Sequence, residues 1–513
     1  SGSSGSGAIG SGAAASGADG SSAGMGSGRA GSGAAGSGVG AIGGAATDAG
    51  PSDGASSVMD GPEGGALSPE GGGNHSDASS AGPLPWPLAN QIVNETVLPT
   101  FPAANFNVVD HGAKCDGTTD DTLAFQQAIS ACSMAGGGHV VVPSGTCSVG
   151  AITLLSNVDL HLSSPQTILR FSGDVTKYPL VLTRFRGTEL MNHSPMIYAY
   201  GQKNIAVTGS GTIDLANTVA FQHDSGNGVS LVTSWGQMGT PVSQRVLPAG
   251  STLRSPSIEP YASDTILIQG VTINNGQFWN IHLVLSKNVT VDGVTIFATA
   301  QETDGCNPES SDHVVIENVT FRTGDDAVAV KSGRDNDGRR IHTPSTNIVV
   351  QHVHFDDNYG ILAIGSEESG GVAHVFGYDM TAADNSNRGV GLHFQYALFM
   401  KANWDRGGVV DDIHLDTIKM SNISGPVVFG DMTYNNITTG PFPPQFGNIS
   451  LSHVVINGAA QVLDVVATPT HPFGAITMDT CTFTNVKNTT NTLVNVQPAP
   501  VLTNVSVNGQ PAH

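Results

Sequence analysis

A short pattern of alternating apolar residues, which returns along most of the chain, constrains the fold more than any other feature. Each copy reads apolar-x-apolar, then two polar or small residues, then apolar-x-apolar again. The copies occupy residues 266–273, 289–296, 314–321, 348–355, 413–420, 449–456 and 476–483. Alternation with period two is typical of strands that bury one face. The two-residue break indicates a corner after which the same side still faces inward.

A two-strand unit of this kind cannot bury a core alone, so copies must stack into a solenoid. A propeller would need four antiparallel strands per blade with hairpin turns, and Asn-Gly or Asp-Gly turns are few here. A leucine-rich repeat would show a Leu/Asn consensus, which the sequence lacks. We therefore predict an all-β fold, a right-handed single-stranded parallel β-helix with rungs about 4.8 Å apart.

The asparagines of several Asn-x-Ser/Thr sequons recur at the corners of these repeats. Asn288, Asn318 and Asn448 each lie directly before or between two predicted strands. Asparagine tolerates the left-handed conformation that tight corners require. We expect these residues to serve as turn residues rather than as glycan carriers.

The N-terminal part of the chain differs in composition from the rest. Residues 1–95 are rich in Gly, Ser and Ala and show no hydrophobic period. Such a segment buries too little apolar surface to offset chain entropy, which predicts a disordered, flexible tail. We expect the β-helix domain to occupy residues 96–513, with ordered sequence beginning near Phe106.

A helix precedes the first repeats and is expected to close the open end of the solenoid. Asp120 or Asp121 is a suitable N-cap, and Leu123 and Ile129 lie on one helical stripe. Glycines 136–138 then end the helix. We predict an N-terminal helical cap with no chemical role.

The net charge and the lack of long apolar runs limit the partners and the location that we expect for this chain. With 20 Lys and Arg against 42 Asp and Glu, the formal net charge is −22, which disfavours binding to nucleic acid or to an anionic membrane. No apolar run approaches the roughly 20 residues of a membrane span. The first residues contain no leader, so we expect a secretion signal to have been removed from an extracellular or periplasmic monomer.

The five cysteines are too few for a disulfide scaffold. One pair among Cys115, Cys132 and Cys147 is close enough in sequence to be bridged, whereas Cys306 and Cys481 are isolated. No cysteine spacing indicates a zinc site.

The segment 302–333 holds the densest set of chemically useful residues. Asp304 and the pair Asp325–Asp326 are separated by about one coil, so stacking would bring three carboxylates together. Inverting glycosidases need two carboxylates roughly 6.5–9.5 Å apart, and clustered charges raise at least one pKa. From spacing alone, calcium binding and plain turn chemistry stay open beside catalysis.

Several motifs in and around this segment resemble those of one enzyme family. They are TDG at 303–305, GDDAVAVKSGRDNDGRR at 324–340, IGSEESGGV at 364–372 and, more weakly, NNGQFWNIHLV at 274–284. Over roughly residues 104–490 the chain resembles the polygalacturonases, family 28 of the glycoside hydrolases, and is most similar to exo-acting and bacterial members. The resemblance implies an inverting hydrolase of pectic polysaccharide or oligosaccharide, without metal or organic cofactor.

Carried over residue by residue, the resemblance makes Asp325 the general acid that protonates the glycosidic oxygen. Asp304 and Asp326 then hold and deprotonate the attacking water. Lys401 corresponds to the lysine that grips the substrate carboxylate, and Lys331 shares period-two parity with Asp325. Lys331 is expected to line the same site, with a surface lysine as the alternative.

Three positions depart from the family pattern and bear on substrate choice. Glu302 replaces an asparagine, Tyr359 replaces the histidine of Gly-His-Gly, and Phe399 replaces the arginine of Arg-Ile-Lys. Phenylalanine cannot replace a bidentate guanidinium, and Glu302 would repel a uronate. These departures predict a neutral or substituted sugar, as in a rhamnogalacturonan-type substrate, with Tyr359 and Glu302 contacting it.

Other residues carry weaker expectations. Trp279 and His282 would offer a stacking platform and a hydrogen-bond donor, with core packing as the alternative. Arg334, Arg339 and Arg340 form a basic turn that could meet an acidic polysaccharide or lie in a solvated loop. The stretch 214–264 interrupts the repeat and could wall off one end of the site, which would favour exo attack.

Two other functional classes remain as alternatives at the level of sequence. A polysaccharide lyase on the same scaffold would need calcium and a basic residue, and its products would have unsaturated ends. A non-catalytic β-helix for adhesion or glycan binding would use the tail as a spacer.

Overall fold

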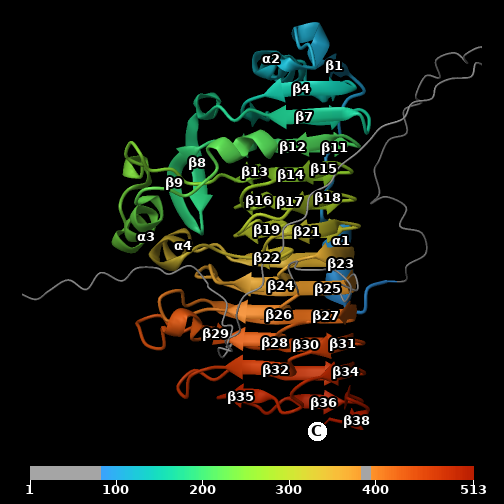
Figure 1. The fold of residues 1–513 in the computed structure, drawn as a ribbon, viewed down its shortest axis with the longest axis vertical. Coiled ribbons are helices and arrows are strands. Elements are labelled where there is room, and N and C mark those ends of the chain that lie inside the picture. The colour runs from blue at the N-terminus through green and yellow to red at the C-terminus, as the bar shows by residue number, and fades with distance from the viewer. Residues whose placement is uncertain (1–82, 383–393, 513) are drawn as a thin grey trace, which may run out of the picture. The chain divides into compact units, whose positions relative to one another are not determined.

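The chain forms a stack of parallel coils (Figure 1), and inward-pointing aliphatic side chains build one continuous core through it. The computed structural model describes residues 83–382 and 394–512. The stack is a right-handed single-stranded parallel β-helix, as predicted. Neighbouring coils pair strand on strand in parallel from β1 to β37, and the order of strands along the stack follows the order along the chain.

One face of the β-helix is an 11-stranded parallel sheet, here called the site sheet. Its strands are β5 (Ile152–Thr153), β10 (Ile197–Tyr200), β13 (Ile258–Tyr261), β16 (Ile281–Val284), β19 (Cys306–Glu309), β22 (Val328–Val330), β24 (Gly360–Gly365), β26 (Tyr396–Lys401), β28 (Pro426–Asp431), β32 (Gln461–Val466) and β35 (Thr492–Val494).

The remaining coil faces form a continuous 25-stranded sheet, which bends at the predicted two-residue corners. Its strands are β1 (Asn105–Asn107), β2 (Asp116–Asp120), β3 (Gly138–Val142), β4 (Gly145–Val149), β6 (Val158–Leu162), β7 (Thr167–Phe171), β11 (Lys203–Gly209), β12 (Thr212–Asp214), β14 (Asp264–Gln269), β15 (Thr272–Asn274), β17 (Lys287–Asp292), β18 (Thr295–Ala298), β20 (Asp312–Glu317), β21 (Thr320–Thr323), β23 (Ser345–Asp357), β25 (Val372–Ala382), β27 (Val409–Ser421), β29 (Gln445–Phe446), β30 (Ile449–Ser452), β31 (Val455–Ala459), β33 (Ile476–Asp479), β34 (Thr482–Val486), β36 (Val501–Thr503), β37 (Ser506–Val507) and β38 (Gln510–Pro511).

Helices and one hairpin lie outside the coils. The antiparallel hairpin consists of β8 (Leu180–Phe185) and β9 (Thr188–His193), and in Figure 1 it lies beside the stack together with α3 and α4. The helices are α1 (Pro87–Glu95), α2 (Thr122–Met134), α3 (Gly228–Met238) and α4 (Asp335–Ile341).

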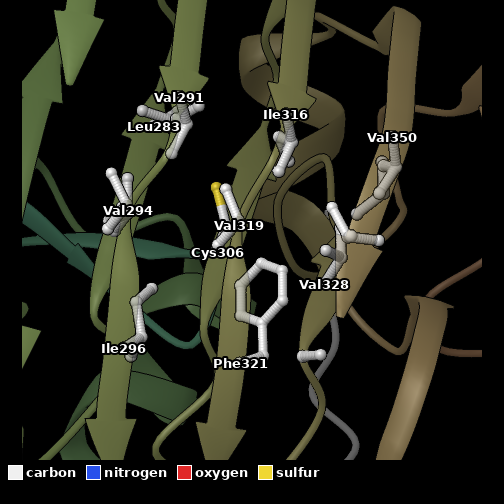
Figure 2. Packing of buried hydrophobic residues seen from close by; sticks show 14 of the residues in the cluster. Leu283, Val291, Val294, Ile296, Cys306, Ile316, Val319, Phe321, Val328 and Val350 are labelled. Carbon is white, nitrogen blue, oxygen red and sulfur yellow. The ribbon is translucent and has the colours of Figure 1, made fainter. Parts of the chain in front are cut away.

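Identical positions of successive coils stack on one another inside the β-helix. Figure 2 shows aliphatic and aromatic side chains of neighbouring coils in contact, and Val291, Ile316 and Val350 form one such column through paired strands. All three are fully or almost fully buried. Each buried methylene contributes roughly 0.8 kcal/mol of transfer free energy, so the repeated columns hold the strands in register.

The corner asparagines adopt the conformation predicted for them. Asn288, Asn318 and Asn448 have φ values of 52°, 55° and 50°. The side chains of Asn288 and Asn318 also donate hydrogen bonds to Asp264 and Asp292 of the preceding coils (2.8 and 2.7 Å). Each asparagine therefore shapes its own corner and links it to the next one.

The start of the ordered chain and the helical cap differ in part from the expectations. Helix α1 lies inside the range assigned to the tail, and its Ala89 and Ile92 are buried against Val349 and Phe376, so order begins well before Phe106. Residues 1–82 of the predicted tail lie outside the described residues.

Helix α2 confirms the predicted cap helix, although not the whole of its predicted apolar stripe. Leu123 is exposed, because the buried side of the helix is formed by Phe125, Ile129 and Cys132 with two alanines. Asp121 precedes the helix but uses its carboxylate to accept from the backbone N–H groups of residues 114 and 115.

A disulfide joins Cys115 to Cys147, which confirms the expected pairing within the first three cysteines. Cys132, Cys306 and Cys481 are free and buried. Within residues 83–382 and 394–512, no helix is long and apolar enough to cross a membrane.

Candidate active site

The three acidic residues singled out from the sequence lie together at the start of two adjacent strands of the site sheet. Asp304 precedes β19, while Asp325 and Asp326 precede β22. The backbone N–H of Gly305 donates to the carbonyl oxygen of Asp326 (3.0 Å), so the two coils are in contact here. Asp304 and Asp326 are buried and Asp325 is half-buried. We call this group the carboxylate triad.

A glycine makes the corner that presents the acidic pair. A Cβ at position 324 would lie 1.9 Å from the carbonyl oxygen of Ala300, a distance that no side chain can occupy. The Gly324 N–H donates to the carbonyl oxygen of Ala298 (2.8 Å), which holds the close approach. The chain therefore turns tightly just before Asp325.

A lysine lies beside each of two of the three carboxylates, and one of them, Lys331, also pairs with Glu367 (3.3 Å). Lys331 Nζ lies 3.6 Å from Asp304 Oδ2, and Lys401 Nζ lies 3.3 Å from Asp326 Oδ2. The side-chain amide of Asn307 donates to Asp304 Oδ2 (2.5 Å). Lys331 is buried, so the surface-lysine alternative is wrong, and the structure brings both predicted lysines to the triad.

A tyrosine that the sequence analysis did not single out completes the surroundings of Asp326. The Tyr396 hydroxyl donates to Asp326 Oδ1. Its ring lies over Gly360, where a Cβ would come within 1.9 Å of Tyr396 Cε2. Gly360 and Tyr396 are paired across β24 and β26, so the missing side chain at 360 is what allows the ring to reach Asp326.

The pKa values of Asp304 and Asp325 are shifted toward the protonated form. Burial raises the pKa of Asp304 well above its usual range, a shift that Lys331 opposes and the other two carboxylates strengthen. Burial and then the Asp326 carboxylate raise the pKa of Asp325 to about 6. The triad therefore retains a proton at mildly acidic pH, which a general acid requires.

Beyond Lys401 the outward face of the site sheet becomes aromatic. The rings of Phe399 and Phe429 stack with centroids 4.5 Å apart, and Tyr396 lies 4.8 Å from Phe399. Tyr359 packs edge-on against Tyr396 (5.7 Å) and is 39% exposed. Tyr359 thus lies beside the triad with its ring accessible, as its predicted role in substrate contact requires.

Glu302 does not present the free negative charge expected from the sequence. Arg186, at the tip of the β8–β9 hairpin, and Arg254 both bind its carboxylate (2.5 and 2.9 Å). Arg254 also pairs with Asp224 (2.8 Å). The expectation that Glu302 repels a uronate is wrong, because two guanidinium groups from distant segments neutralise it.

His282 is not available to a sugar. It is fully buried, and its two ring nitrogens lie 3.0 Å from Glu259 and 2.7 Å from Glu309. Trp279 packs edge-on against the imidazole (4.9 Å) and is itself buried. The core-packing alternative therefore holds for both residues, and the prediction that His282 binds substrate directly is wrong.

The predicted basic turn is a short helix with paired charges. Arg340 on α4 pairs with Glu189 (2.6 Å) and with Asp337 (3.1 Å). Arg339 stacks on Phe442 at 3.6 Å, and Arg334 lies 3.3 Å from Asp335. These arginines fix α4 to its surroundings rather than forming a solvated loop.

Sequence reasoning missed the partners that approach from distant coils or insertions. Tyr396 is 70 positions from Asp326, and Arg186 is 116 positions from Glu302. For Tyr396 a signal existed, because the pairing of β24 with β26 places it beside Gly360. For Arg186 and Arg254 the repeat pattern gives no register, since both lie in segments outside the coils.

Two family models match overlapping parts of the chain. Residues 254–497 match "Glycosyl hydrolases family 28", and residues 105–359 match "Rhamnogalacturonase A/epimerase, pectate lyase-like". The first match contains the complete triad and both lysines.

Individual relatives extend the similarity over most of the domain. A probable polygalacturonase of Vitis vinifera is 28% identical over 396 residues, which is 74% of each chain. An exo-poly-alpha-D-galacturonosidase of Dickeya chrysanthemi is 27% identical over 68% of this chain and 62% of its own length. The crystal structure of an exopolygalacturonase from Thermotoga maritima superposes with a TM-score of 0.74 at 31% identity, covering 82% of this chain and 96% of that one.

Proposed function

Because the chain belongs to family 28 of the glycosyl hydrolases, we propose that it hydrolyses galacturonosyl bonds of pectic polysaccharide with inversion at the anomeric carbon. The observation that carries this proposal is the carboxylate triad with Lys331 and Lys401 beside it. The polygalacturonase names of the relatives support the substrate class.

The three carboxylates of the triad have different neighbours, which suit them to different roles. Asp304 accepts from Asn307 and faces Lys331, and Asp326 accepts from Tyr396 and faces Lys401. These contacts orient the two carboxylates for holding a water. The side chain of Asp325 accepts from the backbone N–H of Asp326 (2.9 Å) and has no ammonium group at salt-bridge distance. We assign the proton that reaches the glycosidic oxygen to Asp325, because a pKa of about 6 lets this carboxyl release and regain a proton near neutral pH.

These environments assign the steps of the reaction. Asp325 gives its proton to the glycosidic oxygen as the bond to the anomeric carbon breaks. Asp304 and Asp326 hold a water on the opposite side of the sugar and accept its proton as the new bond forms. Inversion follows, because water attacks in one step from the face opposite to the leaving oxygen.

The β8–β9 hairpin and the insertion support attack from a chain end. Arg334 N–H donates to the Gly187 carbonyl oxygen at the hairpin tip (3.0 Å), and Arg186 next to it binds Glu302. The stacked rings of Phe185, Phe278 and Trp279 fix the hairpin to the β-helix. A hairpin held this firmly beside the triad blocks a polymer from extending past it in that direction.

The substrate contacts follow from the same arrangement. The exposed ring of Tyr359 offers a face for stacking, and Lys331 and Lys401, which lie next to the reacting carboxylates, add positive charge to the site. Glu302 would act indirectly, by orienting Arg186 and Arg254 at the closed end.

A location outside the cytoplasm fits the chemistry of the fold. The Cys115–Cys147 disulfide is typical of oxidising compartments, and pectic polymers are too large to enter a cell. We propose secretion and action as a monomer, because α2 packs on the core of the first coils at the end where another β-helix would otherwise stack.

The test of this proposal is product analysis in water enriched in heavy oxygen. Wild type, Asp325→Asn and the matched control Asp110→Asn, at an exposed position, are incubated with polygalacturonate, methylated pectin, rhamnogalacturonan and neutral glycans. We expect saturated, singly labelled monosaccharide from wild type and control, and none from Asp325→Asn.

Other products would contradict the proposal in distinct ways. Unsaturated ends absorbing in the ultraviolet would establish a lyase. Full activity of Asp325→Asn would remove the assigned acid. Binding of a glycan without any product from wild type would leave a binding protein.

A further inference from the structure

The two sides of the carboxylate triad differ in chemistry. On the side of the hairpin lie the guanidinium groups of Arg186 and Arg254. On the other side, toward the later coils, lie Phe399, Phe429 and Tyr434, here called the aromatic platform. A sugar chain that crosses the triad must contact both sides.

The platform is a continuous layer built from neighbouring strands. Phe399 of β26 and Phe429 of β28 are paired in register, and their rings stack nearly parallel, at 7° and 4.5 Å. Tyr434 meets Phe399 edge-on at 6.4 Å. Phe399 is buried, whereas Phe429 and Tyr434 are half-buried, so these two rings form the part of the layer that faces solvent. Ring faces of this kind bind the apolar C–H faces of sugars.

The platform offers little to a negatively charged sugar. Among the described residues, the cation stacked on it is Lys401, 4.7 Å from the Phe399 ring, and its ammonium is already paired with Asp326. The next positions along the two strand registers are acidic, since Asp431 pairs with Lys401 and Asp464 pairs with Phe429. A uronate placed here would share one ammonium with these carboxylates.

Neighbouring acids confirm that this side is poor in compensating charge. Burial and then the charge of Asp431 raise the pKa of Asp464, and burial raises the pKa of Asp431. Groups that already resist ionisation for lack of a counter-charge would resist a further anion in the same way. Desolvating an unpaired carboxylate against aromatic rings is costly.

We propose that the sugar bound on the aromatic platform is uncharged at C6, so that the enzyme cleaves next to a methyl-esterified galacturonate or a deoxyhexose. This inference rests on the proposed hydrolase function and specifies its substrate. The uncharged sugar would contact the exposed parts of Phe429 and Tyr434, which pack against the buried Phe399 ring, and the acidic sugar would lie on the hairpin side, where Arg186 and Arg254 pair with Glu302 and Asp224.

The test uses defined oligosaccharides with the full chain. One galacturonate oligomer is unesterified, a second carries a methyl ester only on the sugar beyond the cleaved bond, and a third carries rhamnose there. Wild-type kcat/KM is measured for each, and the affinity of Asp325→Asn for each is measured by titration calorimetry. We expect kcat/KM to be about tenfold higher for either the methyl-esterified or the rhamnose-containing oligomer than for the unesterified one. The difference should appear in KM and in binding affinity. Which of the two uncharged oligomers is preferred shows whether the bound sugar is a methyl-esterified galacturonate or a deoxyhexose.

A substitution that adds a positive charge to the aromatic platform tests the same inference from the side of the protein. Phe399→Arg should raise kcat/KM on the unesterified oligomer by about tenfold and reduce the preference for the uncharged one. Val501→Arg, an exposed position on β36 far from the triad, adds the same charge to this acidic protein and should change neither value.

Outcomes for substrate and for function can be told apart. Equal or better affinity and kcat/KM for the unesterified oligomer in the unsubstituted enzyme would overturn the inference, whatever Phe399→Arg does to folding. Affinity that favours an uncharged oligomer, without any turnover, would uphold the inference about binding and overturn the hydrolase function.

Discussion

Adjacent coils bring ionisable side chains together at several places in this β-helix, and a comparison of two such clusters shows what makes one of them a reaction centre. The carboxylate triad lies at the start of the site-sheet strands. The second cluster, His374, Asp412 and His414, lies on the outer face of the 25-stranded sheet, with contacts of 2.6 and 2.7 Å from Asp412 to the two imidazoles. In both clusters, residues distant in sequence meet because their coils are adjacent.

The difference between the two clusters is their exposure and the charges around them. Asp412 is 33% exposed, and although burial alone would raise its pKa, hydrogen bonds from the two histidines lower it. In the triad, burial and like charges raise the pKa of Asp304 and Asp325 instead. Proximity alone thus produces a solvated ion pair, whereas proximity with burial holds a proton available for transfer.

Removing one carboxylate from each cluster should separate their roles most sharply. Asp304→Asn should lower kcat by about a thousandfold, since general base or acid catalysis contributes roughly 10²–10⁴. Asp412→Asn makes the same chemical change in the exposed cluster and should leave kcat unchanged. The measurement is steady-state release of reducing sugar. Equal losses in both variants would show that folding, rather than chemistry, is affected.

The lysine beside Asp326 should matter nearly as much. Lys401→Met leaves a buried carboxylate without its counter-charge, which typically costs about 3–5 kcal/mol and should lower kcat/KM by about a hundredfold. Lys419→Met, on the exposed side of β27, is the matched control. Chemical denaturation and kinetics together check both effects. Wild-type stability in Lys401→Met would mean that Asp326 is protonated without it.

A single methyl group at position 360 should have a smaller effect. Gly360→Ala places a Cβ against the Tyr396 ring and pushes its hydroxyl away from Asp326, so we expect about a tenfold loss in kcat. Gly447→Ala meets its nearest neighbour at an ordinary 3.4 Å and serves as control. If activity were retained in Gly360→Ala, the Tyr396 hydrogen bond would have no role in turnover.

The architecture was predictable because each strand carries its own periodic pattern. The alternation of apolar and polar residues around Val291, Ile316 and Val350 is enough to predict that they point inward. A corner asparagine such as Asn288 likewise depends only on the local turn. The triad was predictable for the same reason, since Asp304 and Asp326 belong to successive regular coils.

The surroundings of the triad were not predictable in the same way. The neutralisation of Glu302 by Arg186 and Arg254 depends on how a hairpin and an insertion fold back onto the coils, which no local pattern encodes. The prediction that His282 binds substrate was wrong because a polar residue in a strand does not reveal its partners on adjacent coils. Here these partners are two buried carboxylates, Glu259 and Glu309.

The pH dependence of stability should also differ between the two clusters, and this is the smallest of the expected effects. The folded-state pKa of Asp325, about 6, lies above the ordinary value of 3.8, so the folded protein binds more protons and loses stability as pH rises from 4 to 6. Asp325→Asn removes this loss and should gain about 2 kcal/mol over wild type at pH 7, but little at pH 4.

Asp412 should behave in the opposite sense. Its pKa is lowered in the folded protein, so its contribution to stability is present above pH 4 and is lost as pH falls. Asp412→Asn should therefore be less stable than wild type at pH 7 and equal to it under strongly acidic conditions. Thermal unfolding of both variants from pH 2 to pH 7 tests this, and a loss of stability in Asp325→Asn at pH 7 would mean that the folded site favours the charged form of that carboxylate.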